Sequence, residues 1–510
     1  MSIPSKSTPT YLDQLPHEII NIISDYVTCE GHWRTPCNWV NPAACIQSLH
    51  NAWPHSRYEA LTKPYMHHGI TFNGSAFNLK QIIDGFLLEP QTRLWVRFLV
   101  FGCGDLLFDQ QKPFESIKDE CEWLTEACTK LGLKVEDMEL PVMELLHVES
   151  QNPIAERILW PYKRLEFLAQ VLHRVTKFCY STDALWIAPN PVLYERYRRT
   201  WVLPTVALQW QSEDNDMMTE PGSSTSITPV PSVLRSVNQF YLGHGYWQNE
   251  CQDPYQTLLP AFFFPNIRVI QCSNMVPASL NEDLTPLAHD APHPYSSTIT
   301  TLHFTFCDMR TRTYEKFLRL PKALVECSFI HSTHGIGMER CTMSDFVHLL
   351  SNYHSKSLEI LTLDGTEESQ TIGTFWAGPR HDRTPERIGS LKHFENLRVI
   401  EAPIWSLVNC SDREVCNFPE VLPESLEVIK LSLVMTHDKS PQLCLEAIKG
   451  HLECMIEKKR EKYPRLAIVE VYIRYIAIPP GADWDCLYEG FKDSLAGLAM
   501  QEDNVRLIIH

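Results

Sequence analysis

Only a few residues in this sequence have types and spacings that could do chemistry. Cys29, His32 and Cys37 lie close together, and a zinc ion prefers such sulfur and nitrogen donors. The sequence indicates no fourth ligand for such an ion, and the spacing of these three residues matches no common zinc finger. We therefore interpret the two cysteines as free, partly buried thiols and predict no metal site.

The signals for a catalytic site are equally weak. Residues 102–105 (GCGD) follow an apolar stretch, as a phosphate loop would, but the third glycine is missing and we interpret them as a turn. His331 and His334 lie near Cys327 and Cys341, and we interpret them as loop histidines that follow a strand. Nucleotide-binding and nucleophile-elbow motifs do not occur, and no motif places a Ser/His/Asp set. We expect no catalytic residue and no cofactor.

Composition narrows the classes of function. The chain has 510 residues, of which 44% are hydrophobic and 10% aromatic, enough for a large core. A formal charge of −17 argues against a nucleic-acid partner, which needs clustered Lys and Arg. The 17 cysteines are scattered without a C-x-x-C pair, which is typical of reduced thiols in the cytoplasm or nucleus. Neither a signal peptide nor a membrane span is expected, because no long apolar run occurs.

Residues 12–27 (LDQLPHEIINIISDYV) predict a short helix with a wide apolar arc. Pro16 suits the first turn, where its missing N–H is not needed. At 100° per residue, one stripe contains Leu15, Ile19, Ile22, Ile23 and Tyr26, and the arc is widened by Ile20 and Val27. An arc this wide can contact two surfaces. One is the small core of its own module, and we expect the other to belong to a partner protein.

Three sequence elements in order carry a resemblance to a known family. They are Leu15-Pro16-x-Glu18-Ile19, then Leu49-x-x-x-Trp53, then Pro64-Tyr65 leading to a predicted strand at 70–72. Residues 10–72 therefore resemble an F-box domain, a small all-α module. The first loop, residues 28–41, is longer than is usual in that family.

The resemblance implies a function for the whole chain. F-box proteins are substrate receptors of SCF-type cullin–RING ubiquitin ligases, so the module would dock on the adaptor subunit and, through it, join the cullin and RING subunits. The expected adaptor-binding residues are Leu12, Leu15, Pro16, Ile19, Ile20, Ile23 and Trp53. The rest of the chain would hold a protein substrate, and the protein would have no catalytic activity of its own.

From residue 90 to 510 a strand pattern recurs: an aliphatic residue, two free positions, an apolar residue, one free position and another apolar residue. The copies are at 96–101, 175–180, 237–242, 267–272, 299–304, 324–329, 358–363, 397–402, 426–431 and 466–471. From residue 237 they recur about every 33 residues, which resembles irregular leucine-rich repeats. The pattern predicts an α/β solenoid with a parallel sheet, and a non-repetitive α/β domain is the alternative.

Other segments complete this organisation. Helices are predicted at 443–460 and 484–500, and further strands at 466–473 and 505–509. Residues 213–231 are acidic and rich in Ser, Thr and Pro, which predicts a disordered insertion.

The free positions of each strand are expected to point away from the helices and to form the substrate-binding face. Its predicted residues are Tyr241, Gln271, His303, Glu326, Thr362, Glu401 and Lys430. Two other functions stay open: an interaction scaffold that never joins a ligase, and an enzyme on an unfamiliar α/β fold.

Overall fold

The structure is a computed structural model, and it describes about half of the chain in a series of segments. These are residues 69–102, 113–134, 164–181, 236–243, 258–275, 295–331, 341–364, 387–408, 418–435, 441–475, 484–499 and 505–509, apart from single positions within them. The F-box-like residues before 69 and the insertion at 213–231 lie outside the described residues. The chain divides into two compact units, one of residues 1–184 and 231–237 and one of residues 185–230 and 238–510.

The first unit contains three parallel strands in chain order. They are β1 (Gly69–Phe72), β2 (Phe98–Gly102) and β3 (Lys177–Ser181), and β2 pairs with both of the others. Helix α4 (Ala76–Leu88) and a 3-10 turn (Thr92–Leu94) connect β1 to β2, and α5 (Ile117–Lys130) follows β2. The strands predicted at 70–72, 96–101 and 175–180 are confirmed, and the sheet begins at Gly69, before residue 90.

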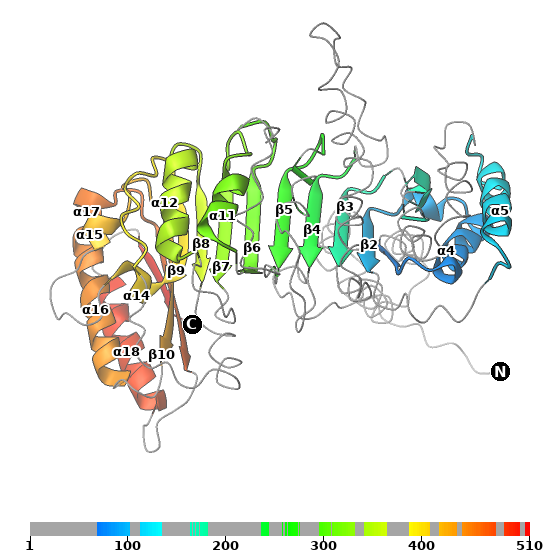
Figure 1. Ribbon diagram of the computed structural model, residues 1–510. Helices are drawn as coiled ribbons and strands as arrows, with labels where there is room; N and C mark the ends of the chain where they lie inside the picture. Colours follow the sequence, from blue (N-terminus) through cyan, green and yellow to red (C-terminus); the bar gives the residue numbers. More distant parts are fainter. Residues whose placement is uncertain are drawn as a thin grey trace, which may run out of the picture. The chain divides into compact units, whose positions relative to one another are not determined.

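The second unit contains a nine-stranded sheet in which every pair of neighbours is parallel (Figure 1). Its strands are β4 (Gln239–Gly243), β5 (Val269–Ser273), β6 (Thr301–Cys307), β7 (Glu326–His331), β8 (Ile360–Asp364), β9 (Val399–Pro403), β10 (Val428–Met435), β11 (Ile468–Tyr475) and β12 (Arg506–Ile509). They lie in chain order, so each strand pairs with the next one along the sequence. The predicted α/β class and parallel sheet are therefore confirmed.

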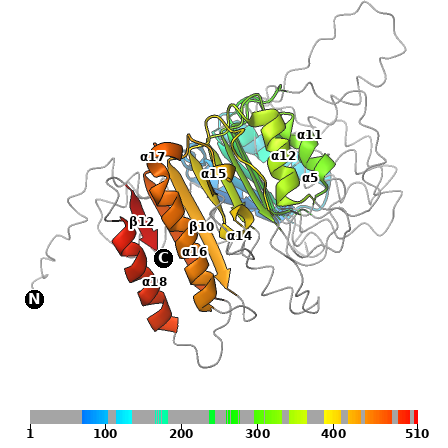
Figure 2. The same ribbon diagram turned by 90° about the vertical axis from the view of Figure 1, so that its left-hand side faces the viewer.

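The repeated triplets form the core because each places its apolar residues on one side of the sheet. In the triplet of β8, for example, Leu358 just before the strand and Leu361 and Leu363 within it are fully buried. Helices α11 (Thr311–Leu318) and α12 (Met343–His354) lie along this side of the strands, as Figure 2 shows. The ring of Phe329 on β7 stacks on Phe346 of α12 with centroids 4.3 Å apart. The triplet side of the sheet is thus the side that the helices cover.

The C-terminal helices follow the predicted pattern with one break. They are α14 (Ile404–Leu407), α15 (Phe418–Val421), α16 (Pro441–Glu457), α17 (Lys459–Lys462) and α18 (Trp484–Ala499). The helix predicted at 443–460 divides at Lys458, and the one at 484–500 is confirmed. Helices α16 and α18 lie side by side in both views (Figures 1 and 2).

The strands from β5 to β11 begin with the same backbone contact. The carbonyl oxygen of Glu359 accepts hydrogen bonds from the N–H groups of Arg398 and Val399, and the carbonyl of Arg398 accepts from Glu427 and Val428. Equivalent pairs of bonds recur along the sheet at Asn238, Arg268, Thr300, Val325 and Glu427. The same local geometry therefore repeats from strand to strand although the sequence spacing varies.

Within the segments described, no helix is long and apolar enough to cross a membrane.

Candidate binding face of the sheet

The strand register aligns the predicted binding residues across the sheet. One continuous row, which we call the central row, runs through Tyr241, Gln271, His303, Ser328, Thr362, Glu401, Lys430 and Glu470. Side chains alternate between the two faces of a strand, so this row lies on the face opposite the buried triplets. Six of the seven predicted residues belong to it.

Glu326 is the exception. It pairs with Thr301 and Ile360, in the row next to the central one, and the partner of His303 on β7 is Ser328. The sequence contains the signal that identifies the correct residue, because every member of the central row lies between the last two residues of its triplet. The same rule finds Glu470, which the sequence analysis missed.

The face is more buried on β4 to β7 than on β8 to β11. On β4 to β7 the outward positions include the buried residues Tyr241, Ser273, Thr301, Thr305 and Ser328. Tyr241 is only 6% exposed, and its hydroxyl lies 2.7 Å from the Oγ atom of Ser273, contrary to the expectation of a solvent-exposed row.

On β8 to β11 the outward side chains are half-exposed. They include Ile360, Thr362, Val399, Glu401, Val428, Lys430, Ile468 and Glu470. This part of the face is therefore the part available to a partner.

Charged groups on the face lie close to one another without forming strong buried pairs. The Nζ atom of Lys430 lies 3.6 Å from Glu470, and the Tyr472 hydroxyl donates a 2.8 Å hydrogen bond to the same carboxylate. The Nε2 atom of His303 lies 3.8 Å from Glu326. Half-exposed pairs of this kind stabilise a fold little.

A second set of charges lies at the beginning of the strands. The Arg398 guanidinium donates to Glu427 at 2.8 Å and lies 3.6 Å from Glu359. The hydrogen bond from Arg398 lowers the pKa of Glu427, and Glu427 stays ionised at neutral pH. This single cation therefore lies between two carboxylates.

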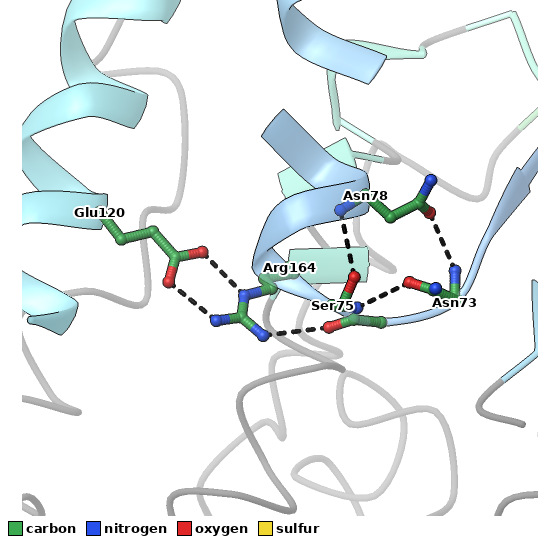
Figure 3. A network of polar contacts seen from close by, with 6 residues as sticks. Asn73, Ser75, Asn78, Glu120 and Arg164 are labelled. Atoms are coloured by element: carbon green, nitrogen blue, oxygen red, sulfur yellow. Dashed lines mark hydrogen bonds and ion pairs between the residues drawn. The ribbon is translucent and has the colours of Figure 1, made fainter. Parts of the chain in front are cut away.

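The first unit contains a buried ion pair with a structural role (Figure 3). Arg164 donates to both carboxylate oxygens of Glu120 on α5, at 2.7 and 2.8 Å, and to the carbonyl oxygen of Gly74 at 3.0 Å. The next residue, Ser75, caps α4 by accepting from the N–H of Asn78. The pair thus holds α5 and the start of α4 to the segment that contains Arg164. The guanidinium binds both carboxylate oxygens of Glu120, as expected of a structural contact.

Two buried thiols of the described segments, Cys327 and Cys128, are poor nucleophiles. Burial, with a smaller contribution from the neighbouring Glu326, raises the pKa of Cys327, so this thiol stays protonated. Burial also raises the pKa of Cys128 to about 11. Within the described segments, no three His, Cys, Asp or Glu residues are grouped so that they could hold a metal ion.

The other predicted site residues lie outside the described residues. These are the adaptor-binding residues Leu12, Leu15, Pro16, Ile19, Ile20, Ile23 and Trp53, and the cysteines and histidine first considered for zinc, Cys29, His32 and Cys37.

No protein-family model matches this chain, and no curated protein matches it either.

Proposed function

We propose that this protein is the substrate-recognition subunit of an SCF-type cullin–RING ubiquitin ligase. The F-box-like residues 10–72 would bind the adaptor subunit, and the sheet would bind a protein substrate. The observation that carries the proposal is the half-open face over β8 to β11, on which register aligns polar and charged side chains from consecutive strands.

We infer that the sheet is the strand layer of an irregular leucine-rich-repeat solenoid. The inference is supported by the chain-order pairing of parallel strands, by the buried triplets of β4 to β11 and by the recurring contact at the start of β5 to β11. Each repeat in such an array packs mainly on its neighbours, which leaves one face of the sheet for a partner.

The mechanism follows from proximity rather than from chemistry by this chain. A receptor that holds a substrate near a ubiquitin-charged enzyme raises the effective concentration of the two reactants. The receptor then needs two binding surfaces, and it needs no nucleophile.

Affinity purification of the full-length protein from native lysate, followed by mass spectrometry, tests the proposal. We expect recovery of an SCF adaptor, a cullin and a RING subunit. Replacing Leu15 and Pro16 with Ala should abolish that recovery while the circular dichroism spectrum stays unchanged, since both are expected adaptor-binding residues of the F-box-like motif. Undiminished recovery with the double variant would exclude this surface as the adaptor site.

The same experiment distinguishes the alternative function. A scaffold that never joins a ligase would use the same half-open face, which lies entirely within residues 360–473. Partners recovered without any adaptor or cullin, and equally with the Leu15/Pro16 variant, would favour the scaffold.

A further inference from the structure

The half-open part of the face contains a row of branched aliphatic side chains. Ile360, Val399, Val428 and Ile468 are paired in register on four adjacent strands, β8 to β11, and all four are half-exposed. We call these residues the aliphatic row. Contiguous apolar side chains on a protein surface are typical of an interaction site.

Carboxylates surround the aliphatic row and outnumber the cations. The acidic residues on or beside it are Glu326, Glu359, Asp364, Glu401, Glu427 and Glu470, and the basic ones are Arg398, Lys430 and Arg506, which pairs with Ile468 at the end of the row. Arg398 and Lys430 each lie within ion-pair distance of a carboxylate of this same set. The surface is therefore apolar in the middle and mainly acidic at its margins, which is complementary to a basic, amphipathic partner.

The geometry of the row favours a helix over an extended peptide. Adjacent strands are about 4.8 Å apart, so the four side chains extend over about 14 Å across the strands. One turn of an α-helix rises about 5.4 Å, so side chains at positions i, i+4, i+7 and i+11 would meet successive strands. In an extended peptide, side chains on one face recur only about every 6–7 Å, so they would not match the spacing of the strands.

We propose that the aliphatic row binds an amphipathic helix of a partner protein, which presents branched aliphatic residues to the row and Lys or Arg to its acidic margins. The inference rests on the proposed function, because it names the chemistry of the substrate segment that this face recognises. The contact lies on β8 to β11 and does not involve residues 10–72.

A designed peptide tests the proposal directly. A labelled peptide of about 18 residues, about 27 Å long as a helix, would carry Ile at the four spaced positions, Lys on both sides of them and Ala elsewhere. Fluorescence anisotropy with the full-length protein at physiological ionic strength should show saturable binding. A peptide with Glu in place of Lys, and a scrambled peptide of the same composition, should each bind at least about tenfold more weakly.

Matched variants locate the contact. Val428→Asp places a charge in the aliphatic row and should weaken binding roughly tenfold or more. Val269→Asp makes the same change at the equivalent position of β5, in the same row of the register but outside β8 to β11, and should leave binding unchanged. The double variant Glu401→Gln and Glu470→Gln keeps the size of both side chains, and we expect it to weaken binding of the Lys peptide alone.

Three results would overturn the inference. One is equal binding of the Lys, Glu and scrambled peptides, another is equal loss with Val428→Asp and Val269→Asp, and the third is no binding of any peptide. Should Val428→Asp not fold, as judged by circular dichroism, the Glu401/Glu470 variant gives the deciding comparison. Adaptor recovery is measured on the same protein, so a failed peptide test with intact adaptor recovery contradicts this inference and leaves the proposed function in place.

Discussion

The imidazole of His354 lies against the backbone of a different helix: its Nε2 atom is 2.7 Å from the carbonyl oxygen of Leu318. Leu318 is the last residue of α11 and His354 is the last residue of α12, so this hydrogen bond joins the C-terminal ends of two adjacent helices. His354 is only 2% exposed, and within the described residues its Nδ1 atom has no hydrogen-bond partner. A carbonyl oxygen only accepts, so Nε2 carries the proton of this hydrogen bond.

This arrangement predicts a pH dependence of stability. Burial lowers the pKa of His354, and the hydrogen bond to Leu318 opposes this only in part. Above about pH 6.5 the imidazole is neutral in both states and contributes no pH dependence. As the pH falls below that value, the unfolded state binds the proton first, so the free energy of unfolding falls by at most about 1.4 kcal/mol per pH unit from this group.

Urea unfolding at pH 7.5 and 5.5 measures the effect. Gln at position 354 keeps a donor for the Leu318 carbonyl but does not titrate, so His354→Gln should lose less stability on acidification than the native protein. The control is His393→Gln, at an exposed position, which should behave like the native protein. Parallel losses in all three proteins would mean that His354 is already protonated or hydrated in the fold.

The side-chain alternation of β8 gives a second prediction. Leu361 is fully buried on the helix side, and its neighbour Thr362 is half-exposed on the other face. Leu361→Ala should cost about 2–5 kcal/mol, because it removes buried methyl groups and leaves a cavity. Thr362→Ala should cost far less, and similar losses in paired urea melts would show that the two faces are wrongly assigned.

The sequence was sufficient to predict the strands because the buried triplet is a local signal. All ten predicted copies contain a strand, and the last two apolar residues of each copy lie on one face by alternation within that strand. The order of the strands in the sheet also follows, since short crossovers favour pairing of sequential strands.

Features that depend on distant residues were not predictable in this way. Burial of Tyr241 on the outward face depends on what surrounds β4, and alternation alone contains no such information. Glu326 is among the predicted binding residues although its position in the triplet differs from that of His303, and the equivalent position on β7 is Ser328. The pairing of Glu120 with Arg164 joins segments of irregular spacing, and no periodicity connects them.

A recurring hydroxyl gives a third prediction. In three places a Ser or Thr just before one triplet donates a hydrogen bond to the backbone of the triplet before it in the chain. The acceptor is each time the carbonyl oxygen of that earlier triplet's first residue. The pairs are Ser236 to Val175, Thr298 to Ile267 and Ser425 to Leu397. Ser425→Ala should cost about 1 kcal/mol, the typical net value of such a bond. The control Ser432→Ala, at a half-exposed position of β10, should be close to neutral, and a neutral Ser425→Ala would show that water replaces the hydroxyl.

The last prediction compares two glutamates of the same helix. Glu120 and Glu126 both lie on α5, and each forms an ion pair, Glu120 with Arg164 and Glu126 with Lys130. The side chains of the first pair are 3% and 12% exposed, and those of the second are 63% and 58% exposed. Glu120→Gln leaves a nearly buried guanidinium without its counter-charge and should cost about 3–5 kcal/mol. Glu126→Gln should cost less than about 0.5 kcal/mol, because water screens an exposed pair. Urea melts of the two variants, followed by far-UV circular dichroism, make the comparison, and equal small losses would mean that Arg164 reaches solvent when its partner is removed.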